Sequence, residues 1–356
     1  MSEKPKVTDE VMYDTLGFAK VHPLKRAVRT KAFPLFILLL AVIAAFAVIS
    51  PLRNNGKQAF FQINTIWFML QDITVTGLLT IGSACLIVSG QIDLSNATVG
   101  SMAGVIIAVG THSKWWGIPW WSAIIVAIGV AAVAGFVNAL LVNELKLPPF
   151  VATMATSTVM TAVISIMTTN SIGNTELTIS FTDESITQLA TFTVWNKLTA
   201  ASVFMVLLFI IYGVVLAKTK FGRTLYLVGG NRAATHLAGI NPKKTSYFLY
   251  INCSVLAALA GICNVSRTGS GSSGALSAYT FSGLTAAILG GISFFGGSGG
   301  MGGAFIGLML LNVFNRGLVM SKVDPYFPPI FNGTLLLLAL TFDSISIRLQ
   351  NRRVGA

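Results

Sequence analysis

Long apolar runs recur along almost the whole of this chain, and they limit the folds open to it more than any other feature. A helix needs roughly 20 apolar residues to cross the hydrocarbon core of a bilayer. Of the 356 residues, 54% are hydrophobic and 10% are charged, against roughly 25% charged in a soluble domain. The sequence therefore predicts an all-α, polytopic membrane protein of about ten helices. The predicted spans are residues 32–50, 66–89, 97–110, 120–142, 148–169, 200–217, 245–266, 279–295, 302–319 and 327–347. The third and eighth are short and rich in glycine, so either is a candidate for a broken or re-entrant element.

The basic residues predict which way the chain is inserted, because cytoplasmic loops are enriched in Lys and Arg. With ten spans, most of the 24 Lys and Arg residues fall on the side that holds both termini and residues 218–244. We therefore expect a cytoplasmic tail over residues 1–31, a transmembrane domain over 32–347 with a cytoplasmic loop at 218–244, and a cytoplasmic tail over 348–356. We expect no cleavable signal peptide before the first span, because no small-residue cleavage pattern follows it.

Several function classes are excluded or disfavoured by what the chain lacks. It has no G-x-x-x-x-G-K-[ST] phosphate-binding loop, and its three cysteines fall in apolar segments with no metal-ligand spacing. The net charge of +12 is not arranged as the basic stripe of a nucleic-acid binder. Carboxylates within the spans are sparse, which disfavours a proton- or sodium-coupled carrier, and no ring of charged residues indicates a passive channel. We expect no catalytic residue and no metal site.

Asp93 interrupts the apolar pattern between the second and third spans, in the sequence Gln-Ile-Asp-Leu-Ser. A carboxylate at this point can accept backbone N–H groups at the start of the following helix. The alternative is contact with a transported solute. We favour the cap over the solute contact.

Hydroxyl side chains recur every four residues along the fifth span, which places them on one slowly rotating face. Such a face suits a pore for a neutral, polyhydroxylated solute, but Ser and Thr also permit close helix packing. A second polar patch on the ninth span has i, i+3, i+4 spacing, and two adjacent phenylalanines precede that span. These residues are candidates for a translocation path: Thr153, Ser157, Thr161, Ser165, Phe294, Asn312 and Asn315, with Arg316 beside the last.

The most polar internal segment, residues 218–244, contains a predicted short helix. Asn231 is a good N-cap residue, alanine pairs follow it, and Gly239 is placed to end the helix. We therefore expect a helix over residues 231–237. A short helix with basic flanks suits docking into a groove on a soluble partner or lying on anionic lipid headgroups.

Four motifs, in order along the chain, resemble those of the permease subunits of bacterial ABC importers for monosaccharides, of the ribose type. They are Gly-Gln-Ile-Asp-Leu-Ser at 90–95, Leu-Pro-Pro-Phe-Val-Ala-Thr at 147–153, Gly-Gly-Asn-Arg-Ala-Ala at 229–234 with Leu-Ala-Gly-Ile at 237–240, and Gly-Gly-Ile-Ser at 290–293 leading to Gly-Gly-Ser-Gly-Gly at 296–300. The resemblance covers residues from about 65 to 347.

This resemblance implies a fold similar to that of the vitamin B12 importer, with a path between two permease subunits. It implies a docking role for residues that match the family motif: Gly230, Asn231, Ala233, Ala234, Gly239 and Ile240. It also implies partners: a second permease chain, identical or related, a cytoplasmic ATPase that holds ATP and Mg²⁺, and an extracytoplasmic solute-binding protein. The chain departs from the family pattern at Gln91, where a second glycine is usual, and at Arg316.

The sequence as a whole predicts the permease subunit of an ATP-driven importer in the bacterial inner membrane, with a sugar or sugar-like solute as cargo. Nucleosides and amino acids remain alternative cargoes, and an ion-coupled carrier is the alternative mechanism. Arg267 and Arg316, both expected on the outward side, would suit an anionic solute.

Overall fold

The computed structural model describes residues 32–53, 55–57, 60, 62–113, 115–169, 178–180, 183–195, 197–324 and 326–354. Within these residues, eight helices are long and apolar enough to cross a membrane, which confirms a polytopic helical membrane protein. They are α3 (Ala32–Arg53), α4 (Ile63–Val88), α6 (Trp120–Asn143), α7 (Pro149–Met167), α9 (Ala200–Lys218), α12 (Pro242–Thr268), α14 (Met301–Met320) and α15 (Phe327–Val354).

The two glycine-rich candidates form shorter helices, so the expected count of ten full spans is not reached among the described residues. Helix α5 (Asn96–Thr111) has 16 residues and α13 (Ser282–Leu289) has 8, which correspond to lengths of about 24 and 12 Å. Helix α13 follows the 3₁₀ turn η1 (Ser277–Tyr279) and ends at Gly290. A β-carbon at Gly290 would lie 2.3 Å from the Gly303 carbonyl oxygen, so the chain there passes directly over α14.

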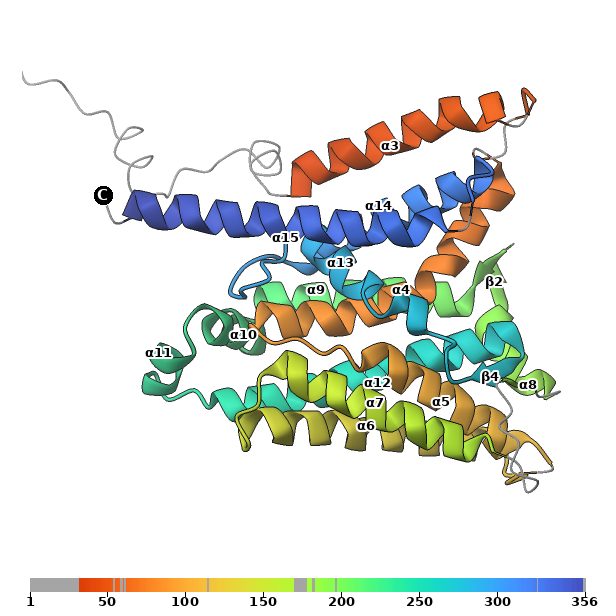
Figure 1. Cartoon of the computed structure of the whole chain (residues 1–356), viewed down its shortest axis with the longest axis horizontal. Helices are drawn as coiled ribbons and strands as arrows, with labels where there is room; N and C mark the ends of the chain where they lie inside the picture. The colour runs from red at the N-terminus through yellow and green to blue at the C-terminus, as the bar shows by residue number, and fades with distance from the viewer. Residues whose placement is uncertain are drawn as a thin grey trace, which may run out of the picture.

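The helices run roughly along one direction, and the bundle has two ends that carry different short elements (Figure 1). One end, which we call the α11 end, carries α10 (Lys220–Gly230), α11 (Arg232–Leu237), the first described turn of α3 and the last turn of α15. The opposite end, called the α8 end, carries α8 (Glu184–Thr191) and short strands. The strands β1 (Thr178–Ser180) and β4 (Ser270–Ser272) pair antiparallel, as do β2 (Thr193–Trp195) and β3 (Leu198–Thr199).

Helix α12 forms the centre of the molecule and packs against α4, α5 and α6. Small residues make this packing close: the β-carbon position of Gly261 lies 2.0 Å from the Gly100 carbonyl oxygen on α5. The three cysteines are free, and Cys85 and Cys253 are buried in this core, as expected for small apolar side chains.

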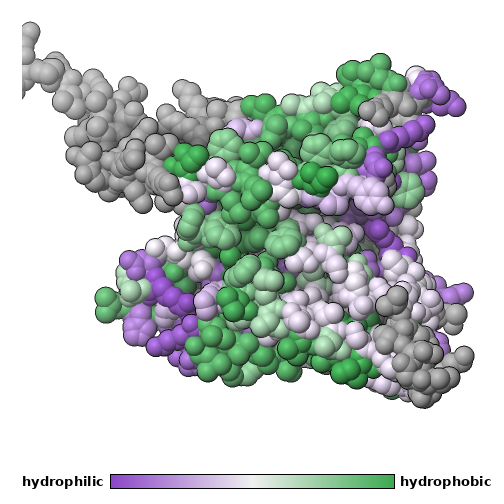
Figure 2. Space-filling model, in the orientation of Figure 1, coloured by the Kyte–Doolittle hydropathy of each residue, from purple (hydrophilic) through white to green (hydrophobic). Residues whose placement is uncertain are grey.

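Apolar side chains also cover the outside of the bundle between its two ends. Figure 2 shows a hydrophobic belt there, with hydrophilic residues concentrated toward the ends. Exposed apolar residues on this surface include Val133, Ile166, Ile210 and Leu337, each more than half exposed. In water such a surface would be unfavourable, and in a bilayer it faces hydrocarbon.

Candidate functional site

The predicted short helix at residues 231–237 is confirmed as α11, and its start has the expected chemistry. The Asn231 side-chain oxygen accepts a hydrogen bond of 2.9 Å from the backbone N–H of Ala234. Gly239 adopts a φ of +79°, a left-handed conformation that glycine accommodates readily and that follows many helix ends. The helix therefore begins and ends where local capping rules place its limits.

The docking residues inferred from the sequence lie together on the surface of the α11 end. Gly230, Asn231, Ala233, Ala234 and Gly239 are exposed, and Ile240 is half-buried. Leu237, which the sequence analysis did not select, is 87% exposed at the tip of the helix. An apolar side chain surrounded by small exposed residues is a shape that a groove on a soluble partner can enclose.

Helix α10, which precedes α11, was missed from the sequence. Leu225 and Val228 are buried, three residues apart on its inner face, while Arg223 and Leu227 are exposed. The segment at residues 218–244 is therefore two packed helices joined at Asn231, rather than a polar loop with one helix in it. The 3.6-residue period was detectable, but the basic and glycine residues of this segment obscured it.

Three backbone segments meet at the inner end of α10 with no side chains between them. A β-carbon at Gly229 would lie 2.0 Å from the Val88 carbonyl oxygen and 2.6 Å from the Gly297 nitrogen. The Gly297 N–H donates a hydrogen bond of 2.9 Å to the Val88 carbonyl oxygen. The end of α4, the end of α10 and the loop before α14 thus touch directly, and we call this contact the glycine junction.

A chain of hydrogen bonds leads from α11 to the break between α4 and α5. Arg232 Nη2 donates to Asn143 Oδ1 at 2.8 Å, Asn143 Nδ2 donates to Ser246 Oγ at 2.9 Å, and Ser246 Oγ donates to Gln91 Oε1 at 2.9 Å. Gln91 is 2% exposed. The glutamine that departs from the family pattern is therefore the buried end of a polar connection from the docking helix.

Asp93 lies in the same break and is 4% exposed. Its Oδ1 accepts hydrogen bonds from the backbone N–H of Ser95 at 2.8 Å and from the Ser95 hydroxyl at 2.6 Å. Ser95 is the N-cap residue of α5. The carboxylate thus stabilises the turn that leads into α5 by binding the residue before its first turn.

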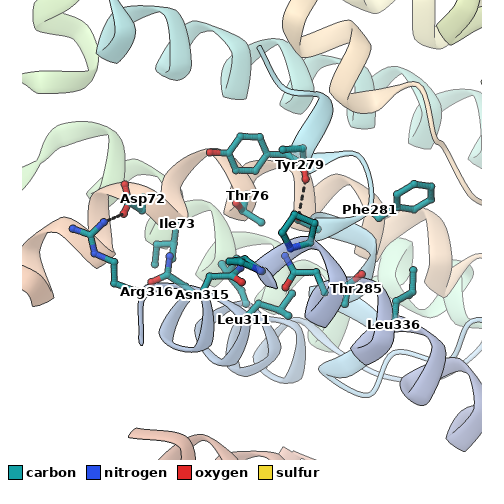
Figure 3. A pocket seen from close by; sticks show the side chains of 18 of the residues that line it. Asp72, Ile73, Thr76, Tyr279, Phe281, Thr285, Leu311, Asn315, Arg316 and Leu336 are labelled. Carbon is teal, nitrogen blue, oxygen red and sulfur yellow. Dashed lines mark hydrogen bonds and ion pairs between the residues drawn. The ribbon is translucent and has the colours of Figure 1, made fainter. Parts of the chain in front are cut away.

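A cavity of about 800 Å³ lies between α4, α13, α14 and α15, toward the α8 end (Figure 3). Its lining includes Asn312, Asn315 and Arg316, the polar patch predicted on the ninth span, together with Thr285 and Asn332. The structure therefore brings two of the predicted path residues to one cavity. Asn332 was not selected from the sequence, because only Thr334 accompanies it as a polar residue in an apolar segment.

An ion-pair triad lies at one side of this cavity. Asp72 Oδ2 lies 3.2 Å from Arg316 Nη1, and Asp72 Oδ1 lies 3.1 Å from Arg267 Nη1. The three side chains are 24–39% exposed, which leaves each partly accessible to solvent. The pairing joins residues far apart in sequence, so the sequence analysis noted the two arginines but not their contact with Asp72.

The predicted hydroxyl face of α7 lies elsewhere, since α7 packs against α5 and α6. Thr153 is fully buried and accepts the Leu94 N–H, while the Ser157 and Thr98 hydroxyls lie 2.7 Å apart. Thr161 and Ser165 donate to carbonyl oxygens four residues back in their own helix. None of the four is among the residues that line the cavity.

Phe294 lies in the loop between α13 and α14, at the α11 end of the bundle. Its backbone N–H donates to Asp343 Oδ2 at 2.8 Å, and its ring meets that of Phe295 edge to face at 5.7 Å. Asp343 also accepts from the Ser293 hydroxyl. This carboxylate of α15 holds the loop that forms part of the glycine junction.

Outside the spans, Glu144 follows α6 and pairs with Lys243 at the start of α12. The Lys243 ammonium donates a hydrogen bond of 2.7 Å to Glu144 Oε2 and holds the pKa of that carboxyl below its usual range. The pair closes the α6–α12 contact next to the docking helix.

Residues 65–340 match the model of one protein family, described as branched-chain amino acid transport system / permease component. A ribose import permease protein of Escherichia coli (strain K12) is 31% identical over 86% of this chain and 92% of its own length. A fructose import permease protein of Rhizobium meliloti is 32% identical over 88% of this chain and 84% of its own. An autoinducer 2 import system permease protein of Photorhabdus temperata is 27% identical over 88% and 91%. No solved structure matches the chain.

Proposed function

The chain belongs to the branched-chain amino acid transport system / permease component family, and on that premise we propose that it carries a sugar or sugar-like solute. It is a membrane-spanning permease subunit of an ATP-binding cassette importer and is not itself an ATPase. Relatives named for ribose and fructose import, matched over nearly their whole length, support the choice of cargo over nucleosides or amino acids.

The observation that carries the proposed mechanism is the exposed, capped helix α11 and its hydrogen-bonded connection to the interior. We propose that a cytoplasmic ATPase, which binds ATP and Mg²⁺, encloses α11 through Leu237 and the small residues beside it. Arg232 begins the connection to Asn143, and the glycine junction gives α10 direct backbone contact with α4 and the loop before α14. Movement of the docking segment then displaces those elements together.

The same proposal fixes the sidedness of the molecule and its further partners. The first described turn of α3, α11 and the end of α15 share one end of the bundle (Figure 1), which supports placing that end in the cytoplasm, as the distribution of basic residues predicts. The cavity then opens toward the side from which a solute-binding protein delivers cargo. We propose a path between this chain and a second permease, in a fold similar to that of the vitamin B12 importer.

The docking role is tested by replacing Ala234 with aspartate. A charge enclosed without a partner in an interface costs several kcal/mol, so co-purification of the ATPase and ATP-driven sugar uptake into proteoliposomes should both fall. Gln188→Asp, on the exposed surface of α8 at the opposite end, is the matched control and should leave both unchanged. If the Ala234→Asp protein retains its ATPase and transports at the parental rate, the docking role is wrong.

A further inference from the structure

Some of the buried polar atoms that have no hydrogen-bond partner in the described part of the chain belong to the cavity between α4, α13, α14 and α15. Four of them lie on residues of its lining: Thr285 Oγ1, Asn315 Oδ1, Arg316 Nε and Asn332 Oδ1. Thr285 is itself 1% exposed. Leaving such an atom unsatisfied in a buried position is unfavourable. The residues that bear these atoms line one space, which favours a polar occupant that supplies the missing partners once these side chains turn toward it.

The chemistry of these atoms indicates which uncharged groups the occupant carries. Each asparagine amide offers a hydrogen-bond acceptor and donors, and the Thr285 hydroxyl both donates and accepts. Hydroxyl groups complement all three side chains, because a hydroxyl also donates and accepts. The volume of about 800 Å³ falls within the range of small-molecule sites.

The net charge beside the cavity indicates which charged group the occupant carries. Arg267 and Arg316 share a single carboxylate, that of Asp72, so the triad carries one excess positive charge. No other carboxylate is among the residues described as lining the cavity. Asp72 engages Nη1 of Arg316 and leaves Nε without a partner (Figure 3). The Nε edge of a guanidinium is one of the two edges that bind a carboxylate in bidentate fashion.

We propose that this cavity is a solute subsite for a sugar acid, in which Arg316 binds the carboxylate and Thr285, Asn315 and Asn332 bind hydroxyls. The proposal rests on the proposed function, since it narrows the cargo from sugars in general to those that carry a carboxylate. Asp72 competes with the solute for Arg316, because its carboxylate already holds Nη1 of that side chain.

The test uses the purified permease–ATPase complex without its solute-binding protein, so that selectivity in the permease itself is measured. D-glucuronate and D-glucuronamide are matched probes that differ in the charge of one group. We expect glucuronate to bind roughly tenfold more tightly than the amide by calorimetry, because hydrogen bonds to charged groups are stronger than neutral ones. Equal affinities, or no binding of either probe to the folded complex, would overturn the proposal and assign the cavity to water.

Two variants separate the role of Arg316 from a general effect of charge. Arg316→Gln should remove the preference for glucuronate, whereas Arg223→Gln, at an exposed site of α10, should leave it intact. Asp72→Asn removes the competing carboxylate and should tighten glucuronate binding. This variant replaces Arg316→Gln as the test if the Arg316→Gln complex proves unstable. A preference that survives Arg316→Gln, or weaker glucuronate binding by Asp72→Asn, contradicts the assignment.

Failure of this inference is distinguishable from failure of the proposed function. A complex that keeps its ATPase and imports only neutral sugars would exclude the sugar-acid subsite and leave the importer role intact. Loss of ATPase binding in the Ala234→Asp protein is measured independently of any solute.

Discussion

Close packing of α5 against α12 allows the cost of a single methyl group to be worked out from the structure. A β-carbon at Gly261 would lie 2.0 Å from the Gly100 carbonyl oxygen, whereas ordinary contact begins at 3.4 Å. To accommodate alanine, the two backbones must therefore separate by about 1.4 Å. Both elements lie in the core, where extra methyl groups typically cost about 1–3 kcal/mol. We expect Gly261→Ala to lower the free energy of unfolding by at least that amount.

Gly104, on the facing helix, provides the matched control. Its β-carbon position lies 3.7 Å from the Gly261 carbonyl oxygen, which is an ordinary contact. Because alanine favours a helix over glycine by about 1 kcal/mol, Gly104→Ala should be neutral or stabilising. Of the two substitutions, only Gly261→Ala is thus expected to destabilise the protein.

Thermal unfolding of the purified protein in detergent, followed by circular dichroism and by resistance to protease, measures this difference. Gly261→Ala should unfold at a lower temperature than the parent, and Gly104→Ala at the same or a higher one. If both variants change the unfolding temperature in the same direction by similar amounts, the reasoning from backbone contact is refuted.

Three further predictions concern the polar connections. Ser246→Ala should lower the free energy of unfolding by about 1–3 kcal/mol, because Gln91 Oε1 loses its buried donor; an unchanged melting temperature would contradict the role of this bond. Glu144→Gln should lower the free energy of unfolding at neutral pH. The difference in unfolding free energy between parent and variant should vanish as the pH falls through the lowered pKa of Glu144, because protonation of the parent breaks the same pair with Lys243. A difference that persists in acid would exclude that pair as its cause. A cysteine at the exposed Thr161 should react with small aqueous thiol reagents at a rate that changes with substrate and ATP if α7 lines the path; a rate that is the same in every nucleotide state assigns this face to packing or lipid.

Local signals explain which parts of the structure followed from the sequence. The apolar runs predicted the positions of all eight long helices, and the limits of α11 followed from the amide of Asn231 and the backbone freedom of Gly239. Both depend on residues close together in the chain. Capping bonds and hydrophobic length need no knowledge of the rest of the fold.

Contacts between residues far apart in the chain explain which features the sequence did not predict. Asp72 pairs with Arg316 although 244 positions separate them, and nothing local to either residue indicates the partner. The length of α13 was also unpredictable, since the chain leaves the helix at Gly290, where the Gly303 backbone passes close by. Asn332 had only Thr334 as a polar neighbour in the sequence, and its place at the cavity follows only from the packing of α15 beside α13.

The glycine junction also constrains how the protein is made. Its parts come from Val88 to Gly90, from Gly229 and from Gly296 to Gly297, so the end of α4 has no permanent neighbours when it leaves the ribosome. At about 5–20 residues per second, the roughly 200 residues that separate the first part from the last take about 10–40 s to synthesise. During that interval the Val88 carbonyl oxygen lacks its Gly297 donor. Assembly of this region therefore waits for nearly the whole chain, and a truncated product would present an incomplete surface to the cell's quality control.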